Sequence, residues 1–247
     1  MQDLIPPMVR PTGALFHDQQ LRKDATRASQ KDHIGLLVES RSYMNKMLRI
    51  PLHASPEQSA RLQALQAAFA EACNHLSPLV QKSRVWNRVA LHHLAYKELR
   101  QKYPDMGSQM ICNVIYSVSR TSRLVFQHPA SPFNVALLGE RALPLLRFTA
   151  NSPVYFDRHT LSIKEGQLSL YALGGRMHFN LCVHPRDRDR FENQKLREIV
   201  LSRRRDGLYQ LAFWFSDDKE EPAASVPDSA HPARLPLPKY VQIEEAA

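Results

Sequence analysis

The feature that most constrains the fold is a short strand-like segment that passes directly into a strongly signalled helix. Residues 46–54 read as a strand, and Ser55 and Gln58 then have the spacing of a capping box, with Pro56 at the first helical position. Apolar residues recur at three- and four-residue steps after this start, namely Leu62, Leu65, Phe69, Ala72, Cys73 and Leu76. The spacing predicts a helix with one buried face, which Pro78 should end or kink.

Two further helices are predicted before residue 126. Residues 86–102 carry a helical pattern with the apolar positions Val89, Leu91, Leu94, Ala95, Tyr96 and Leu99. Ser108 can cap the next helix, in which Arg120 and Arg123 point away from a buried stripe made by Ile111, Val114, Ile115, Val118 and Val125. Three helices joined by short breaks predict a bundle.

Beyond His128 the spacing becomes that of strands. Short strands are predicted at 145–149, 154–156, 161–163, 168–171 and 177–181, separated by turn residues at roughly ten-residue intervals, as in a small barrel. A charged loop at 185–190 precedes two last strands, 196–202 and 208–215. The dipeptide Asp206-Gly207 between them is the favoured two-residue hairpin turn.

The lone strand before Ser55 needs partners, and only the later strands supply them. We therefore predict an α+β fold in which a small antiparallel, wedge-like β-barrel, residues 43–54 and 144–216, is split by an inserted helical domain, residues 55–143. Residues 1–42 lack a clean period and are predicted to be a loosely ordered extension. Residues 217–247 are predicted to be an acidic, proline-rich tail.

The charge of the chain is concentrated in its middle. The formal net charge is +9, but residues 42–216 hold 24 of the 33 Lys and Arg residues and only 12 of the 24 Asp and Glu residues, an excess of +12. Such an excess on a folded region is typical of a protein that binds a polyanion, because each neutralised phosphate releases counterions. A basic but inert solvated surface is the alternative.

Basic side chains are therefore the candidate binding residues. They are Lys82, Arg84, Arg88, Arg120, Arg123, Arg147, Arg176, Arg203, Arg204 and Arg205. Five aromatic residues could stack bases, with core packing as the alternative for each, namely Trp86, Tyr96, Tyr116, Tyr171 and Trp214.

No pattern favours catalysis, a metal or a cofactor. Asp187, Asp189 and Glu192 alternate with arginines, which indicates a self-neutralised solvated turn and not a two-metal site. The adjacent His92 and His93 face different directions on a helix, which suits joint metal binding poorly. The three cysteines form no Cys-x-x-Cys motif, and each is interpreted as a buried small hydrophobe, namely Cys73, Cys112 and Cys182.

Nothing in the sequence indicates a membrane or secretory protein. No apolar run approaches the roughly 20 residues that a bilayer span requires, and residues 1–10 lack the hydrophobic core of a signal peptide. The chain is predicted to be cytoplasmic.

Several local motifs occur in a fixed order along residues 46–215. They are the opening strand with Ser55-Pro56-Glu57-Gln58, then Phe69-Ala70-Glu71-Ala72-Cys73-Asn74, Asn87-Arg88 with Leu91-His92-His93-Leu94-Ala95-Tyr96-Lys97-Glu98-Leu99-Arg100, Ser108-Gln109-Met110, Tyr155-Phe156-Asp157 with Thr160-Leu161-Ser162, Gly175-Arg176, and the hairpin Asp206-Gly207-x-Tyr209-x-Leu211. These motifs and the order of the elements resemble the N-terminal half of the TnpB (OrfB) proteins of insertion-sequence transposons, which are RNA-guided nucleases related to type V CRISPR effectors.

The resemblance implies both a fold and a ligand. In that family the first strand and the later strands form a wedge barrel, the helices form a recognition domain, and both hold the guide RNA and its heteroduplex with target DNA. Arg176 matches the family's Gly-Arg and is expected to contact a backbone phosphate. The family's RuvC nuclease domain follows the wedge, whereas residues 217–247 are too short for it and lack its carboxylates and its Cys-x-x-Cys zinc element.

The resulting hypothesis is a non-catalytic protein that binds structured, guide-like RNA, with an RNA–DNA heteroduplex as a further ligand. One alternative is a DNA-binding transposon or transcription regulator. A second is a protein-interaction subunit of a larger RNA-guided effector complex, which contacts a separate nuclease or effector protein. A degenerate transposon fragment without function is a third.

Overall fold

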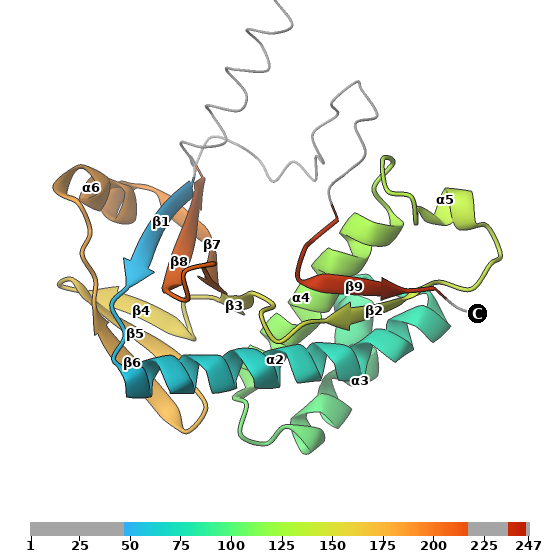
Figure 1. Ribbon diagram of the computed structural model, residues 1–247, viewed down its shortest axis with the longest axis horizontal. Coiled ribbons are helices and arrows are strands. Elements are labelled where there is room, and N and C mark those ends of the chain that lie inside the picture. The colour runs from blue at the N-terminus through green and yellow to red at the C-terminus, as the bar shows by residue number, and fades with distance from the viewer. Residues whose placement is uncertain (1–46, 217–236, 246–247) are drawn as a thin grey trace, which may run out of the picture. The chain divides into compact units, whose positions relative to one another are not determined.

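The computed structural model describes residues 47–216 and 237–245, which lie within one compact unit, 47–247 (Figure 1). The predicted extension, 1–42, and most of the predicted tail lie outside the described residues. The described part is a mixed α+β structure with antiparallel sheets.

Helix α2 (Pro56–Ser83) begins as the capping box predicts. The Ser55 hydroxyl accepts from the Gln58 amide N–H at 3.1 Å, and the Gln58 side-chain oxygen accepts from the Ser55 N–H at 2.9 Å. Leu62, Leu65 and Phe69 on the predicted face are completely buried. The helix start and its buried face are therefore confirmed.

The predicted end of this helix at Pro78 is wrong, because α2 continues to Ser83. A proline inside a helix removes one hydrogen bond and costs about 3 kcal/mol. Pro78 itself is exposed, but Leu76 and Val80 on either side of it are buried in the core. Their burial offsets the cost of the proline, so the last turns remain helical.

Helix α3 (Arg88–Lys102) is capped by Asn87, whose side chain accepts from two backbone N–H groups. It buries a narrow stripe at four-residue spacing, Leu91, Ala95 and Leu99. The sequence also placed Val89 and Leu94 among its apolar positions, but they are 65% and 55% exposed. A stripe of that width covers only one side of a helix, so α3 has other helices on one side only.

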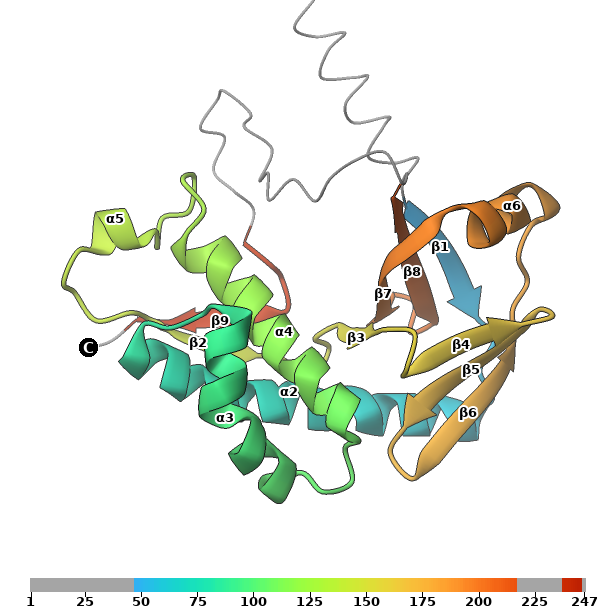
Figure 2. The ribbon, with the colours of Figure 1, turned by 180° about the vertical axis from the view of Figure 1, so that it is seen from behind.

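Helix α4 (Ser108–Phe126) lies at the centre of the helical region and is buried on nearly every side. Figure 2 shows it crossing α2, and it also contacts α3. Its N-cap is Gly107 without a side-chain hydrogen bond, so the predicted cap at Ser108 is wrong. Arg120 and Arg123 are exposed, as predicted, and so is Ser108 at the start of the helix.

Strand β1 (Met47–Leu52) finds its partner late in the chain. It pairs antiparallel with β8 (Tyr209–Ser216), so that Leu48 lies opposite Phe213. The sheet has the order β1-β8-β7-β3, with β7 spanning Lys195–Arg203 and β3 spanning Val154–Phe156. This pairing confirms that the helices are inserted between β1 and its partner strands.

The predicted barrel is not confirmed, because none of the described sheets closes on itself. Strands β4 (Leu161–Lys164), β5 (Gln167–Ala172) and β6 (Gly175–Asn180) form a separate antiparallel sheet. Periodic turns predict antiparallel strands, but they do not determine which strands share a sheet.

The strand predicted at 145–149 also lies outside the four-stranded sheet. Strand β2 (Leu145–Phe148) pairs with β9 (Val241–Glu244), which belongs to the segment predicted to be a tail. Val241 and Ile243 alternate with polar residues as in a strand, and Val241 is buried. The prolines and acids that precede this short strand obscured it in the sequence.

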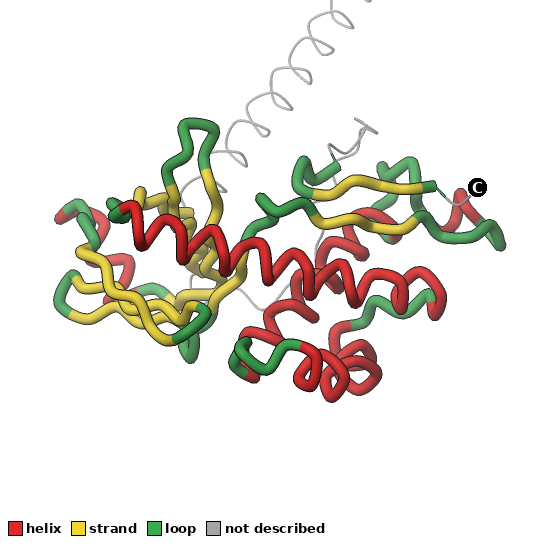
Figure 3. Tube along the Cα trace, turned by 60° about the horizontal axis from the view of Figure 1, so that its bottom comes forward, coloured by secondary structure: helices red, strands yellow, loops and turns green. Residues whose placement is uncertain are grey.

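Helix α2 runs alongside strands and loops from later in the chain (Figure 3). Side-chain amides on this helix attach it to them. Four such amides donate to backbone carbonyls, in the order Gln58 to His178, Gln66 to Ser152, Asn74 to Phe148 and Gln81 to Leu143, at 2.9–3.0 Å. One helix thus contacts both the β4–β5–β6 sheet and the β2 strand, and a continuous hydrophobic core lies around it.

Three local predictions differ from the structure. The loop at Asp206-Gly207 has three residues, since Arg204 N–H donates to Leu208 O and Gly207 takes a φ of +87°. The charged segment predicted as a loop is helix α6 (Pro185–Asn193), which places Phe191 against Phe213 and Phe215 at 5.1 Å each. Helix α5 (Val135–Leu138) is a single turn that was not predicted.

The cysteines differ in exposure. Cys73 is buried, and burial raises the pKa of its thiol. Cys112 is half-buried and Cys182 is exposed, so the interpretation of Cys182 as a buried residue is wrong. Across the described residues, no helix combines the length and the apolar character that a membrane crossing requires.

Candidate nucleic-acid interface

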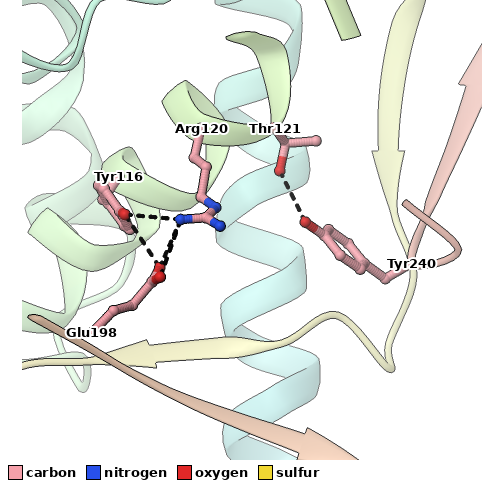
Figure 4. A network of polar contacts seen from close by, with 5 residues as sticks. All are labelled: Tyr116, Arg120, Thr121, Glu198 and Tyr240. Atoms are coloured by element: carbon pink, nitrogen blue, oxygen red, sulfur yellow. Dashed lines mark hydrogen bonds and ion pairs between the residues drawn. The ribbon is translucent and has the colours of Figure 1, made fainter. Parts of the chain in front are cut away.

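Charged and aromatic side chains come together where α4 meets β7. Arg120 of α4 donates from Nη1 to both carboxylate oxygens of Glu198 on β7, at 3.1 Å each, and to the Tyr116 hydroxyl at 3.3 Å (Figure 4). The Tyr116 hydroxyl in turn donates to Glu198 Oε1 at 3.2 Å. The three side chains therefore form a closed hydrogen-bonded triangle between a helix and a strand.

Two further residues complete this group. The Arg88 guanidinium, at the start of α3, lies 5.2 Å from the centre of the Tyr116 ring. The Tyr155 ring of β3 packs edge-on against Tyr116 at 5.4 Å and has Arg120 5.9 Å from its centre. We refer to Arg88, Tyr116, Arg120, Tyr155 and Glu198 as the Arg120 cluster.

Exposure and charge differ across the Arg120 cluster. The Arg120 side chain is 49% exposed and Glu198 is 15% exposed, so the carboxylate lies behind the guanidinium. Burial by itself would lower the pKa of Arg120, but the Glu198 carboxylate and the neighbouring phenols raise it above its ordinary value. Arg120 is therefore a fixed, permanently charged group that reaches the surface.

The phenols of the cluster stay protonated over the physiological pH range. Burial raises the pKa of Tyr116, and the Glu198 carboxylate raises it further. Burial also holds the pKa of Tyr155 well above its ordinary value, with Tyr240 as the next cause. Neutral phenols of this kind can donate hydrogen bonds and can pack against a cation at the same time.

Helix α4 also contacts the segment that leads into β9, through the residue next to Arg120. The hydroxyls of Thr121 and Tyr240 lie 3.5 Å apart (Figure 4), and Tyr240 also packs against Phe148 of β2. The Tyr240 carbonyl accepts hydrogen bonds from Thr149 N–H and Ser152 Oγ. Arg120 thus extends from a helix that both β7 and this segment contact, which restricts where its charge can lie.

The structure places the predicted basic residues in several separate positions. Arg88, Arg120 and Arg123 come together on α3 and α4, with Arg123 Nη2 3.5 Å from Ser119 Oγ. Lys82 lies exposed in the last turn of α2. Arg84, next to it, has a structural role: it ends α2 in a left-handed conformation and donates to the carbonyls of Gly139 and Arg141.

Two other predicted residues are held by contacts within the chain. Arg147 pairs with Glu244 at 3.0 Å across β2 and β9. Arg176 donates to Ser169 Oγ at 2.8 Å and to the Ser169 carbonyl at 3.1 Å, so its side chain lies along the β5–β6 pair. Contacts of this kind position a charge, but they also use donors that a phosphate would need.

The three arginines of the final hairpin also differ in their contacts. Arg203 donates to the Gly207 carbonyl and lies 5.8 Å from the centre of the Tyr209 ring. Arg204 pairs with Asp206 at 2.7 Å. Arg205 is exposed, and within 47–216 and 237–245 no polar partner of its side chain is found.

The five aromatic residues that could stack bases all have intermediate exposure. All are half-buried, so part of each side chain is accessible, namely Trp86, Tyr96, Tyr116, Tyr171 and Trp214. Trp86 packs against Phe126 at 5.7 Å, and its carbonyl accepts from Ser119 of α4. It therefore lies beside the part of α4 that carries Arg123.

Sequence reasoning missed Glu198, which orients Arg120. The two residues are 78 positions apart, and β7 changes register against β8 between Leu196 and Glu198, which breaks the alternation that marks the faces of a strand. The sequence did contain one signal for it, since Glu198 is a single acidic residue in a basic segment. Among the described residues, no group of three His, Cys, Asp or Glu side chains could hold a metal ion.

Comparison with known proteins adds no relative. No protein-family model matches the chain, and no curated protein matches it.

Proposed function

We propose that the chain is a non-catalytic nucleic-acid-binding protein of the cytoplasm, which resembles a TnpB protein without its nuclease domain. It binds structured, guide-like RNA and, as a further ligand, an RNA–DNA heteroduplex. The observation that carries the proposal is the Arg120 cluster, in which two exposed arginines are fixed against aromatic rings in a region with a charge excess of +12.

The geometry of Arg120 suits a backbone phosphate. Its contacts to Glu198 and Tyr116 are all made by Nη1, and across the described part of the chain no hydrogen bond of Nη2 or Nε is found. The remaining donors form one edge of the guanidinium fork, which matches two phosphate oxygens. Glu198 fixes the fork in place, so less conformational entropy is lost on binding.

Shape recognition follows from the fixed positions of these charges. A-form RNA is recognised mainly through its backbone and hydroxyl groups, and unpaired bases stack on aromatic side chains. The Arg120 cluster supplies Arg88 and Arg120 for the backbone, and the half-buried Trp86, whose backbone carbonyl is bound by Ser119 of α4, is the aromatic residue available for stacking. A surface with mobile lysines alone would bind random RNA equally well.

The test compares charge-matched variants on a structured RNA recovered with the protein at moderate salt. Arg120→Ala should weaken this RNA about tenfold more than random RNA of equal length, since charge-assisted hydrogen bonds contribute about 1.5–3 kcal/mol. Lys97→Ala removes one exposed charge from α3 outside the cluster and should weaken both RNAs by the same small factor. If Arg120→Ala weakened the binding of both RNAs equally, the surface would be a generic polyanion binder that does not recognise RNA structure.

The absence of catalysis is part of the proposal and has its own test. Purified protein with Mg²⁺ or Mn²⁺ and its bound RNA should leave DNA uncut. Metal-dependent cleavage that survives repurification, and is lost on mutating a carboxylate of this chain, would overturn this part.

A second candidate function is a protein-interaction subunit of an RNA-guided effector complex. The observation that favours it is the exposure of Val89 and Leu94 on α3, two large apolar side chains with solvent around them. Sequencing of the nucleic acid that co-purifies with the chain distinguishes these candidate functions. A discrete RNA supports the first, double-stranded DNA supports a DNA-binding regulator, and none supports the interaction subunit.

A further inference from the structure

A second polar surface lies away from the Arg120 cluster, on the outer face of the β4–β5–β6 sheet. Alternation buries Leu168, Leu170, Met177 and Phe179 on the inner face. The strand register aligns polar residues in rows on the outer face, with Lys164, Gln167 and Asn180 in one row and Ser162, Ser169 and His178 in the next. No Asp or Glu occurs in the three strands, so a polyanion crossing this face meets no carboxylate of theirs.

One end of this face is hollowed where β6 meets the start of α2. The hollow has a volume of about 350 Å³, and its lining includes His53, Gln58, Gln167, His178, Asn180 and Cys182. We refer to it as the β6 depression. The bond from Gln58 Nε2 to the His178 carbonyl, 2.9 Å long, fixes its wall, since Gln58 also belongs to the capping box of α2.

The lining of the β6 depression contains no Lys, Arg, Asp or Glu, and it combines the apolar Phe179 with side-chain amides that carry donors and acceptors. Gln167 and Asn180 are exposed, and no partner of either side-chain amide is found among the residues that the structure describes. Each amide offers both an N–H donor and a carbonyl acceptor, which is the pattern on the edge of a nucleobase. His53 and His178 add flat rings that can stack or form hydrogen bonds.

The cations lie beside the depression and not inside it. Lys164 is opposite Gln167, and Arg176 precedes His178 by two positions on the same outer face. A free phosphate would require cations in the lining. A metal ion is also disfavoured, because the described residues contain no group of three suitable ligands. A planar uncharged group attached to an anionic backbone matches both the lining and its borders.

We propose that the β6 depression holds one unpaired nucleobase of the bound RNA, while Lys164 contacts the phosphate on one side of it and the fixed charge of Arg176 attracts the backbone on the other. The inference rests on the proposed function, because it requires that the chain binds RNA. A paired base is stacked inside its helix and cannot enter, so the depression selects RNA with a bulged or unpaired nucleotide.

The test uses one RNA hairpin in five forms, fully paired or with a single-nucleotide bulge of each of the four bases. The unmodified protein should bind at least one bulged form about tenfold more tightly than the paired form, since each of two amides can contribute one hydrogen bond, which changes an equilibrium by about two- to twelvefold. The double variant Gln167→Ala with Asn180→Ala should bind all five equally. These side chains are exposed, so their loss leaves the core intact.

The matched control is the double variant Gln101→Ala with Gln242→Ala, which removes two exposed amides from α3 and β9. It should retain the preference for the bulge. A preference that persists in the Gln167 and Asn180 variant, or that the unmodified protein lacks for every base, would overturn the inference while RNA binding stands. A protein that binds none of the five RNAs would overturn the proposed function itself.

A crosslink gives a second measurement that does not depend on affinity. With 4-thiouridine at the bulge, ultraviolet light should attach the RNA to the tryptic peptide 177–186, which contains His178, Asn180 and Cys182. Attachment confined to peptides of α3 or α4 would place the unpaired base at the Arg120 cluster and would contradict the assignment.

Discussion

At the scale of single residues, the Arg120 cluster shows how burial and charge act together. Tyr155 is 5% exposed, and burial raises its pKa well above the ordinary value although the Arg120 cation nearby acts in the opposite direction. Tyr103 has a pKa raised to about 12, with burial as the first cause and Glu71 as the second. Both phenols are therefore neutral in the folded chain at pH values where unfolded tyrosine already ionises.

The raised pKa of Tyr155 predicts alkaline destabilisation. Because the folded-state pKa lies above the unfolded value of about 10, its contribution is complete below pH 10 and is lost as pH rises towards the folded-state pKa. Above pH 10 the unfolding free energy of the unmodified chain should therefore fall as pH rises. In Tyr155→Phe this fall should be smaller, by up to about 1.4 kcal/mol for each pH unit. Urea unfolding at pH 8, 10 and 11 checks this, and an unchanged slope would contradict it.

At the scale of elements, helix α2 determines how much of the chain folds together. It contacts β2, α4 and β5, and its buried face lies inside the continuous core. The position at which the helix begins could be predicted, because a capping box is a local sequence signal. Its attachment through Gln58, Gln66, Asn74 and Gln81 could not be predicted, since the partners of these amides lie 62–120 positions away.

Truncating a buried residue of α2 should therefore destabilise the whole described unit. Phe69→Ala removes a completely buried ring, and such a change costs about 3–5 kcal/mol through lost burial and the cavity left behind. Gln63→Ala, on the exposed side of the same helix, should change stability by less than about 0.5 kcal/mol. Urea unfolding followed by circular dichroism should show a single shifted transition in the first variant.

Strand β9 shows where the sequence was insufficient at the same scale. Its four residues follow a proline-rich, acidic segment, and a strand of that length has a weak pattern by itself. Only its partner β2, far earlier in the chain, reveals it. Similarly, Arg88 and Arg120 could be chosen from their charge, but their joint contact with Tyr116 depends on how α3 packs on α4.

The pairing of β9 predicts that the end of the chain contributes to stability. Removal of residues 237–247 takes away Tyr240 and the buried Val241, and it leaves the backbone of β2 unpaired. We expect the melting temperature to fall by several degrees, as about 1–3 kcal/mol of stability is lost. Removal of residues 246–247 alone, which lie beyond the strand, should leave the melting temperature unchanged.

At the scale of the whole molecule, the arginines that make up the charge excess lie in several places and differ in how many donors they have available. The structure describes Arg120 with donors still available, whereas Arg204 pairs with Asp206 and Arg203 caps the Gly207 carbonyl. Counting basic residues in the sequence treats these arginines as equal. The difference between them depends on contacts that only the folded hairpin and the α4–β7 junction create.

This difference predicts how salt dependence divides between the two arginine groups. Each phosphate contact that is lost should reduce the slope of log affinity against log salt by up to about one unit. Because only Arg205 of the hairpin has no polar partner in the described residues, changing Arg203, Arg204 and Arg205 together to Ala should reduce the slope by about one to two units and not three. Arg88→Ala with Arg120→Ala should reduce it by about two.

The measurement is RNA binding between about 50 and 200 mM salt, for the unmodified chain and both variants. A reduction of three units in the hairpin variant would mean that RNA displaces Asp206 from Arg204 and Gly207 from Arg203, so that the contacts seen in the free chain open on binding. An affinity that does not change with salt in the unmodified chain would exclude a nucleic-acid backbone as the ligand, because no counterions would then be released.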